Sequence, residues 1–190
     1  MYDDEPIRRR GRLAPFIALA VAIVLAGLFV VLAGADASTN ETASSPLLAR
    51  PAPDATGELA DGTSFDLARR KGSWVVLNFF TSTCVPCVQE HPELVRFADD
   101  QERLGTAGAD LYTVVYDETD RSTVADFFAS RGGEWPVVFD DDGSFAVAFG
   151  VSQVPETWVV DPLGVVRQRY IGTITADFLG RQLQVLREAG

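Results

Sequence analysis

The chain has 190 residues, of which 47% are hydrophobic and 23% charged, and its formal net charge is −11. This length allows one domain of ordinary size with its own hydrophobic core, in addition to shorter terminal segments. The acidic balance argues against a nucleic-acid-binding protein, because binding to phosphate groups depends on an excess of lysine and arginine.

The first feature along the chain is an apolar segment preceded by basic residues. Residues 13–34 contain no charged side chain, and this segment is long enough to cross a bilayer as a helix. Four arginines stand just before it: Arg8, Arg9, Arg10 and Arg12. By the positive-inside rule, residues 1–12 form a cytoplasmic tip and the rest of the chain lies outside the cytoplasm.

The competing interpretation of this segment is a cleaved signal peptide, for which Ala35-Asp36-Ala37 offers a small-x-small cleavage site. The apolar run is longer than the usual hydrophobic region of a signal peptide, so we favour an uncleaved, single-pass anchor in the cell membrane. Residues 35–56 are rich in serine, threonine, alanine and proline, which predicts a flexible linker. The folded domain is then expected over residues 57–190.

Strand and helix patterns alternate within the domain, after a small hairpin around the turn Asp61–Ser64. Strands are expected at 74–80, 111–116 and 137–139, and an antiparallel hairpin at 157–160 and 165–170. Helices are expected at 86–99, 122–130, 144–149 and 175–189. Parallel strands joined by helices and followed by a hairpin predict an α/β three-layer sandwich on a mixed central sheet.

The only two cysteines of the chain, Cys84 and Cys87, lie between the apolar strand pattern at 74–80 and a helical pattern. A helix N-terminus offers unpaired N–H groups and a positive dipole end, which favour a thiolate. Two cysteines at this place can close and reopen as a disulfide with little backbone movement. The spacing therefore predicts the dithiol of a disulfide oxidoreductase.

Two other interpretations of the cysteine pair are weaker. A closed zinc site needs four ligands, and the chain offers only one further soft ligand, His91, so we expect no metal site. A purely structural disulfide across two residues closes so short a loop that it constrains the unfolded chain very little.

Further motifs add to the CxxC pair and make a more specific pattern. They are Trp74–Phe80 with Cys84–Cys87, Glu90–Pro92, Gly150–Thr157 and Asp161–Gly164. Together they resemble the membrane-anchored, thioredoxin-like thiol-disulfide oxidoreductases of the TlpA/ResA/CcmG (DsbE) family, over roughly residues 50–188. The resemblance implies a thioredoxin-like fold and no cofactor beyond the redox-active disulfide. One departure is Thr83, which stands where the family usually has a tryptophan that forms part of the partner-docking surface.

The resemblance also implies a function and partners. Such domains reduce disulfides in exported clients, including apocytochrome c during cytochrome c maturation. A membrane thiol transporter of the CcdA/DsbD type supplies their electrons. Within this pattern Cys84 is the expected nucleophile and Cys87 the resolving thiol, so that a mixed disulfide on Cys84 is released by Cys87.

Several neighbours of the dithiol are candidate site residues. Glu90 stands three residues after Cys87 on a similar helix face, and in the resembled family an acid at this position influences the thiols. Asn78 occupies the position where ordinary thioredoxins hold a buried acid; since an amide cannot shuttle protons, Glu90 is expected to act as the catalytic proton carrier. The competing interpretation of Glu90 is a solvated helix glutamate.

The expected substrate-binding residues are Pro86, Val154, Pro155 and Glu156. Pro155 resembles the cis-proline that faces the dithiol in thioredoxin-like folds, and a cis bond there would aim the backbone of Val154 at the bound partner. Glu156 follows it and is expected near the active site, the alternative being a surface charge.

Two alternative functions stay open from the sequence. One is a disulfide-forming oxidase or isomerase, because the residues between the cysteines tune the reduction potential without setting the direction of electron flow. The other is a copper-handling module that uses Cys84, Cys87 and His91 as ligands. With no second histidine, His91 is expected instead to be a surface or capping residue.

Overall fold

The computed structural model describes residues 14–34 and 41–189, and the chain divides into two units, Met1–Ser38 and Thr39–Gly190. The first unit contains the helix α1, Ala14–Gly34, whose side chains are described for residues 15–29 and are exposed. Within the described residues, no helix combines the length and the apolarity that crossing a membrane requires. The predicted cytoplasmic tip, residues 1–12, lies outside the described residues.

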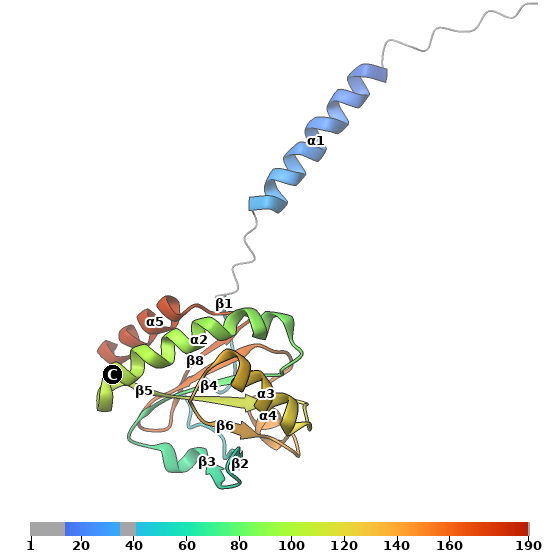
Figure 1. The fold of residues 1–190 in the computed structure, drawn as a ribbon. Coiled ribbons are helices and arrows are strands. Elements are labelled where there is room, and N and C mark those ends of the chain that lie inside the picture. The colour runs from blue at the N-terminus through green and yellow to red at the C-terminus, as the bar shows by residue number, and fades with distance from the viewer. Residues whose placement is uncertain (1–13, 35–40, 190) are drawn as a thin grey trace, which may run out of the picture. The chain divides into compact units, whose positions relative to one another are not determined.

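The second unit is built on a mixed sheet with the strand order β1-β8-β7-β4-β5-β6-β2-β3 (Figure 1). Its strands are β1 Glu41–Thr42, β2 Thr56–Leu59, β3 Ser64–Asp66, β4 Trp74–Phe80, β5 Ala109–Val115, β6 Val137–Phe139, β7 Glu156–Val160 and β8 Val166–Ile171. The strand β4 pairs parallel with β5 and antiparallel with β7, which confirms the prediction of a mixed central sheet.

Helices cover both faces of this sheet. The α-helices of the domain are α2 Val85–Arg103, α3 Arg121–Arg131, α4 Ser144–Phe149 and α5 Ala176–Ala189; short 3₁₀ helices follow β3 at Leu67–Arg70 and α2 at Gly105–Ala107. Side chains of α2 and α5 form one apolar cluster with Val76 of β4, whereas α4 packs in another cluster with Val75 and Leu77. Successive side chains of a strand point to opposite faces, so β4 is apolar almost throughout because both of its faces are covered. The predicted three-layer α/β sandwich is therefore confirmed.

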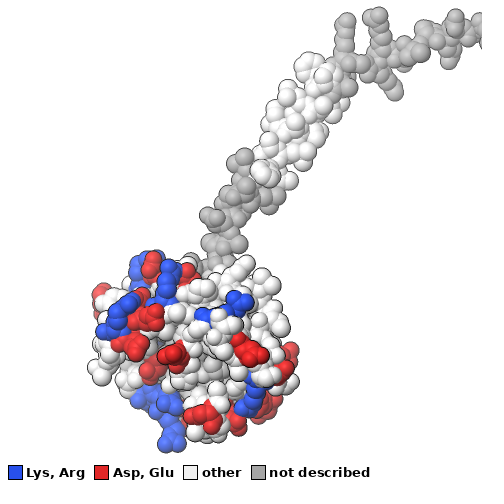
Figure 2. All heavy atoms as spheres, in the orientation of Figure 1, with Lys and Arg blue, Asp and Glu red and all other residues white. Residues whose placement is uncertain are grey.

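Charge is distributed without a dominant patch on the face shown in Figure 2, where acidic and basic side chains are interspersed over the domain. This arrangement gives that face no single-sign surface that would attract a basic partner at long range. The net charge of −11 is consistent with a role in keeping the protein soluble.

The chain before β2 is ordered against the domain, contrary to the prediction of a flexible linker over residues 35–56. Residues 41–53, here called the strap, follow the edge strand β8. The strap begins as β1, which pairs with β8, and continues with hydrogen bonds from Ala43 N–H to the Arg169 carbonyl (2.8 Å) and from Ala52 N–H to the Gly164 carbonyl (2.8 Å). The prediction is wrong for residues 41–56, because main-chain groups hold the strap and leave no side-chain periodicity in the sequence. Residues 35–40 lie outside the described residues.

The strap protects what would otherwise be an open sheet edge, since an uncovered β8 would present unpaired N–H and C=O groups. We predict that a domain beginning at Asp54 is less stable than one beginning at Thr39, by at least about 2 kcal/mol, because it loses the main-chain hydrogen bonds of the strap. Urea unfolding of the two proteins measures this difference. Equal free energies of unfolding would mean that the strap contributes no net stability.

Candidate active site

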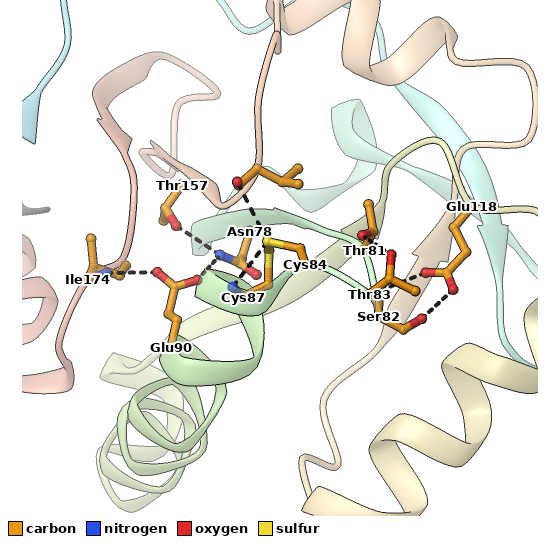
Figure 3. Close-up of a disulfide and its surroundings, with 11 residues drawn as sticks. Asn78, Thr81, Ser82, Thr83, Cys84, Cys87, Glu90, Glu118, Thr157 and Ile174 are labelled. Carbon is orange, nitrogen blue, oxygen red and sulfur yellow. Dashed lines mark hydrogen bonds between the residues drawn. A yellow bond between two sulfur atoms is a disulfide. The ribbon is translucent and has the colours of Figure 1, made fainter.

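The two cysteines lie at the carboxyl end of β4, where α2 begins, and they form a disulfide (Figure 3). Cys84 is the N-cap residue of α2, and its Sγ atom accepts the N–H of Cys87 at 3.1 Å. Cys84 is partly exposed, whereas Cys87 is only 2% exposed. The helix N-terminus therefore supports a thiolate on Cys84, the sulfur that a partner can reach.

The segment around Pro155 faces the disulfide. The Val154–Pro155 peptide bond is cis, as the resemblance implied, and the carbonyl oxygen of Val154 lies 3.6 Å from Cys84 Sγ. Pro86, the residue just before Cys87, is exposed in the first turn of α2. The structure thus brings three of the predicted substrate-binding residues to the dithiol; their contact with a substrate stays a prediction.

Glu90 is a buried residue rather than a solvated helix glutamate, with 1% of its surface exposed. Its Oε1 atom accepts the main-chain N–H of Ile174 (2.8 Å) and its Oε2 atom accepts the side-chain amide of Asn78 (3.0 Å). Burial raises the pKa of Glu90 to about 8, although both of these hydrogen bonds favour the carboxylate. The carboxyl group can therefore gain or lose a proton near neutral pH.

Asn78 connects Glu90 to the sheet. Its amide also donates to Thr157 Oγ1 on the neighbouring strand β7, at 3.1 Å. The spacing from Cys84 identifies Asn78 in the sequence, but no sequence pattern links Asn78 or Glu90 to Thr157 and Ile174, because strand pairing and the turn before α5 bring these partners to the site.

Glu156 directly follows the cis-proline segment, but its side chain is neither a substrate contact nor the surface charge that was the alternative prediction. Its side chain is 0% exposed and pairs with Arg169, whose Nε atom lies 2.9 Å from Oε1, while Trp158 Nε1 donates to the same oxygen at 2.7 Å. Because Thr157 points toward Asn78, the adjacent Glu156 points to the opposite face of the sheet. The prediction that this carboxylate contacts substrate is corrected: its charge is taken up by an internal ion pair.

His91 is likewise buried, so its prediction as a surface residue is wrong, whereas the alternative of a capping residue agrees with its hydrogen bond to a helix end. It is 3% exposed, its Nε2 atom lies 2.8 Å from the carbonyl oxygen of Gly132, and its ring packs against Phe127 and Phe128. Within the described residues, no group of three or more histidine, cysteine, aspartate or glutamate side chains is arranged to hold a metal ion. Gly132 is the C-cap residue of α3, so His91 satisfies a carbonyl group at that helix end.

A second carboxylate contacts the turn before the dithiol, and no sequence pattern selects it. Glu118, in the loop between β5 and α3, accepts the main-chain N–H of Ser82 (2.7 Å) and also the Ser82 hydroxyl. Ser82 stands two residues before Cys84, in the turn that leads into α2. Figure 3 shows Glu118 and Glu90 on opposite sides of the disulfide.

The fold and this dithiol agree with comparisons to known proteins. A family model described as Redoxin matches residues 48–180. The chain belongs to the Redoxin family. The thiol-disulfide oxidoreductase ResA of Bacillus subtilis is 29% identical over 136 residues, which are 72% of this chain and 74% of the relative. The thiol:disulfide interchange protein HelX of Rhodobacter capsulatus is 31% identical over 131 residues, which are 68% of this chain and 69% of the relative.

Solved structures give the same assignment. A DsbE-type thiol:disulfide interchange protein from Chlorobium tepidum superimposes with a TM-score of 0.62 at 28% identity, covering 74% of this chain and 96% of that structure. StoA from Bacillus subtilis gives a TM-score of 0.59 at 26% identity, covering 69% and 98%. This redoxin protein is therefore a thiol-disulfide oxidoreductase of the ResA/DsbE/HelX type, with Cys84 and Cys87 as its CxxC pair.

The buried Glu90 predicts a specific dependence of stability on pH. The carboxyl group titrates near 4.5 in the unfolded chain and near 8 in the folded domain, so between these values the folded state holds a proton that the unfolded state has released. The free energy of unfolding therefore falls as the pH rises from about 4.5 to about 8, and this contribution is constant above the upper value. Urea unfolding across this range measures the slope.

The variant Glu90→Gln removes the titrating group, so its unfolding free energy should lack this part of the slope. Glu102→Gln, which changes an exposed glutamate on the same helix, serves as the matched control and should keep the wild-type slope. Identical slopes in wild type and Glu90→Gln would contradict the elevated pKa of Glu90.

Proposed function

We propose that this thiol-disulfide oxidoreductase works as a reductant outside the cytoplasm, acting on disulfides of exported proteins such as apocytochrome c during cytochrome c maturation. The observation that carries the proposal is the buried carboxyl group of Glu90 behind the dithiol. Strong oxidants of the thioredoxin type stabilise their reduced, thiolate form. Because the pKa of Glu90 is about 8, its carboxylate is partly populated at neutral pH and predominant above pH 8; in that form it opposes formation of thiolates and so favours a dithiol that gives up its electrons.

The proposed reaction transfers two electrons in two exchanges. The Cys84 thiolate attacks a client disulfide, forms a mixed disulfide and releases one client thiolate. Cys87 then loses its proton and attacks Cys84 Sγ, which forms the Cys84–Cys87 disulfide and releases the second client thiolate. The client disulfide is reduced and the protein dithiol is oxidised, with no cofactor beyond the cysteine pair.

Glu90 is the proposed acceptor of the Cys87 proton. Cys87 is almost completely buried, so bulk water has little access to its thiol, whereas Glu90 lies one helical turn away. A carboxyl group with a pKa of about 8 is partly ionised at neutral pH and can take this proton reversibly. Pro86, Val154 and Pro155 are the proposed contacts for the client chain, since the Val154 carbonyl lies 3.6 Å from Cys84 Sγ and the two prolines adjoin Cys87 and Val154 in the chain.

Each turnover leaves the protein as a disulfide, so an electron donor must reduce it again. We propose a membrane thiol transporter of the CcdA/DsbD type, together with an anchor at residues 13–34 that leaves residues 1–12 in the cytoplasm. The charge-free segment and the four arginines before it support this placement.

In spheroplasts, external protease should digest the domain while an epitope on residues 1–12 stays protected; cleavage of that epitope, or its loss from the mature protein, would argue against the anchor.

Measuring the reduction potential of the Cys84–Cys87 pair directly tests the proposed direction of electron flow, from this protein to its client. Equilibration with dithiothreitol or glutathione should give a value near or below about −270 mV, the potential of thioredoxin. A value near about −120 mV, as in a strong oxidant, would show that the protein forms disulfides instead. The same titration on Glu90→Gln should give a higher potential above pH 8, where only the wild type carries the carboxylate.

A further inference from the structure

The loop that carries the nucleophile is held by an acidic side chain from a different part of the chain. The strands β4 and β5 run parallel and end side by side, with Phe80 opposite Val115. The main-chain N–H of Tyr116 donates to the Phe80 carbonyl at 2.8 Å, which extends this pairing past the end of β5. The loop before Cys84 and the loop that begins at Tyr116 are therefore neighbours at the active-site edge of the sheet.

The contact between these loops is made by one carboxylate. Glu118 accepts two hydrogen bonds from Ser82, one from its main-chain N–H at 2.7 Å and one from its hydroxyl. Ser82 lies inside a turn that the Cys84 N–H closes by donating to the Thr81 carbonyl at 3.3 Å. Hydrogen bonds to an ionised acceptor are stronger than neutral ones, so this double contact restrains the turn that sets the position of Cys84.

We propose that Glu118 is a positioning residue for thiol–disulfide exchange: by clamping Ser82 it holds the Thr81–Cys84 turn in the geometry of the disulfide form. The clamp favours the oxidised protein over the reduced one, and so makes the dithiol a stronger reductant. The inference rests on the exchange chemistry of Cys84 and Cys87, not on the client or the compartment proposed above. The two proposals can therefore fail separately.

The clamp, meaning the two hydrogen bonds from Ser82 to Glu118, and a simple effect of the Glu118 charge predict opposite changes in the reduction equilibrium for one substitution. Ser82→Ala removes the hydroxyl donor and leaves the carboxylate charge less compensated. If the charge alone mattered, the variant would oppose a thiolate on Cys84 more strongly and would be harder to reduce. If the clamp matters, the turn is loosened and the variant is easier to reduce.

The experiment is a glutathione redox titration of the full chain and its variants at pH 7. Glu118→Gln should raise the equilibrium constant for reduction about tenfold, which is about 30 mV for this two-electron couple. Ser82→Ala should raise it in the same direction, about threefold, for the loss of one hydrogen bond. Asp117→Asn removes the same charge from an adjacent exposed residue that makes no side-chain hydrogen bond in the described structure, and should change the constant about twofold or less.

Thermal unfolding of the oxidised and reduced forms completes the test. The clamp predicts that both variants lower the Tm of the oxidised form more than that of the reduced form. An equal decrease of Tm in the oxidised and reduced forms, with an unchanged equilibrium constant for reduction, would show that Glu118 has only a structural role and would overturn the proposal. A decrease of the constant in Ser82→Ala, or an increase in Asp117→Asn as large as in Glu118→Gln, would assign the effect to charge and also overturn it.

Discussion

The burial of one carboxyl group organises this active site. Glu90 projects from α2 into the space between β4 and the segment before α5, where its two oxygens take one hydrogen bond from each of those elements. Burying a carboxyl group is costly unless it is hydrogen-bonded or protonated, and both conditions apply here. The same residue thus ties the helix that carries the cysteines to the sheet and keeps a titratable proton close to the buried sulfur.

The elements that the sequence predicted well are those determined by local pattern. The strand β4 is an almost continuous apolar run because both its faces are covered, and this run predicts the strand. The CxxC pair predicts the start of α2 without knowledge of any contact between distant residues. The positions of these elements in an α/β sheet were enough to place the dithiol at a strand end, where such sheets hold their sites.

The features that sequence reasoning missed depend on partners that lie far along the chain. Glu156 and His91 are polar residues whose burial no local pattern indicates, and each is buried because a distant group, Arg169 or the Gly132 carbonyl, forms a hydrogen bond with it. The sequence predicts a flexible linker where the strap lies, because the hydrogen bonds of the strap use main-chain atoms and produce no periodicity in the side chains. Glu118 is one of many acidic residues, and only the parallel pairing of β4 with β5 selects it.

The two glutamates near the disulfide differ in how they can act, and the difference follows from solvent access. Glu90 is buried, so ionisation of its carboxyl group is costly, and in the proposed mechanism it acts both as the proton acceptor of Cys87 and, when ionised, by opposing thiolates. Glu118 is half-exposed, so solvent screens its charge and its influence runs through the hydrogen bonds that it makes to the turn before Cys84. In the proposed mechanism, proton transfer and the geometry of the nucleophile are therefore controlled separately, by Glu90 and by Glu118, from opposite sides of the disulfide.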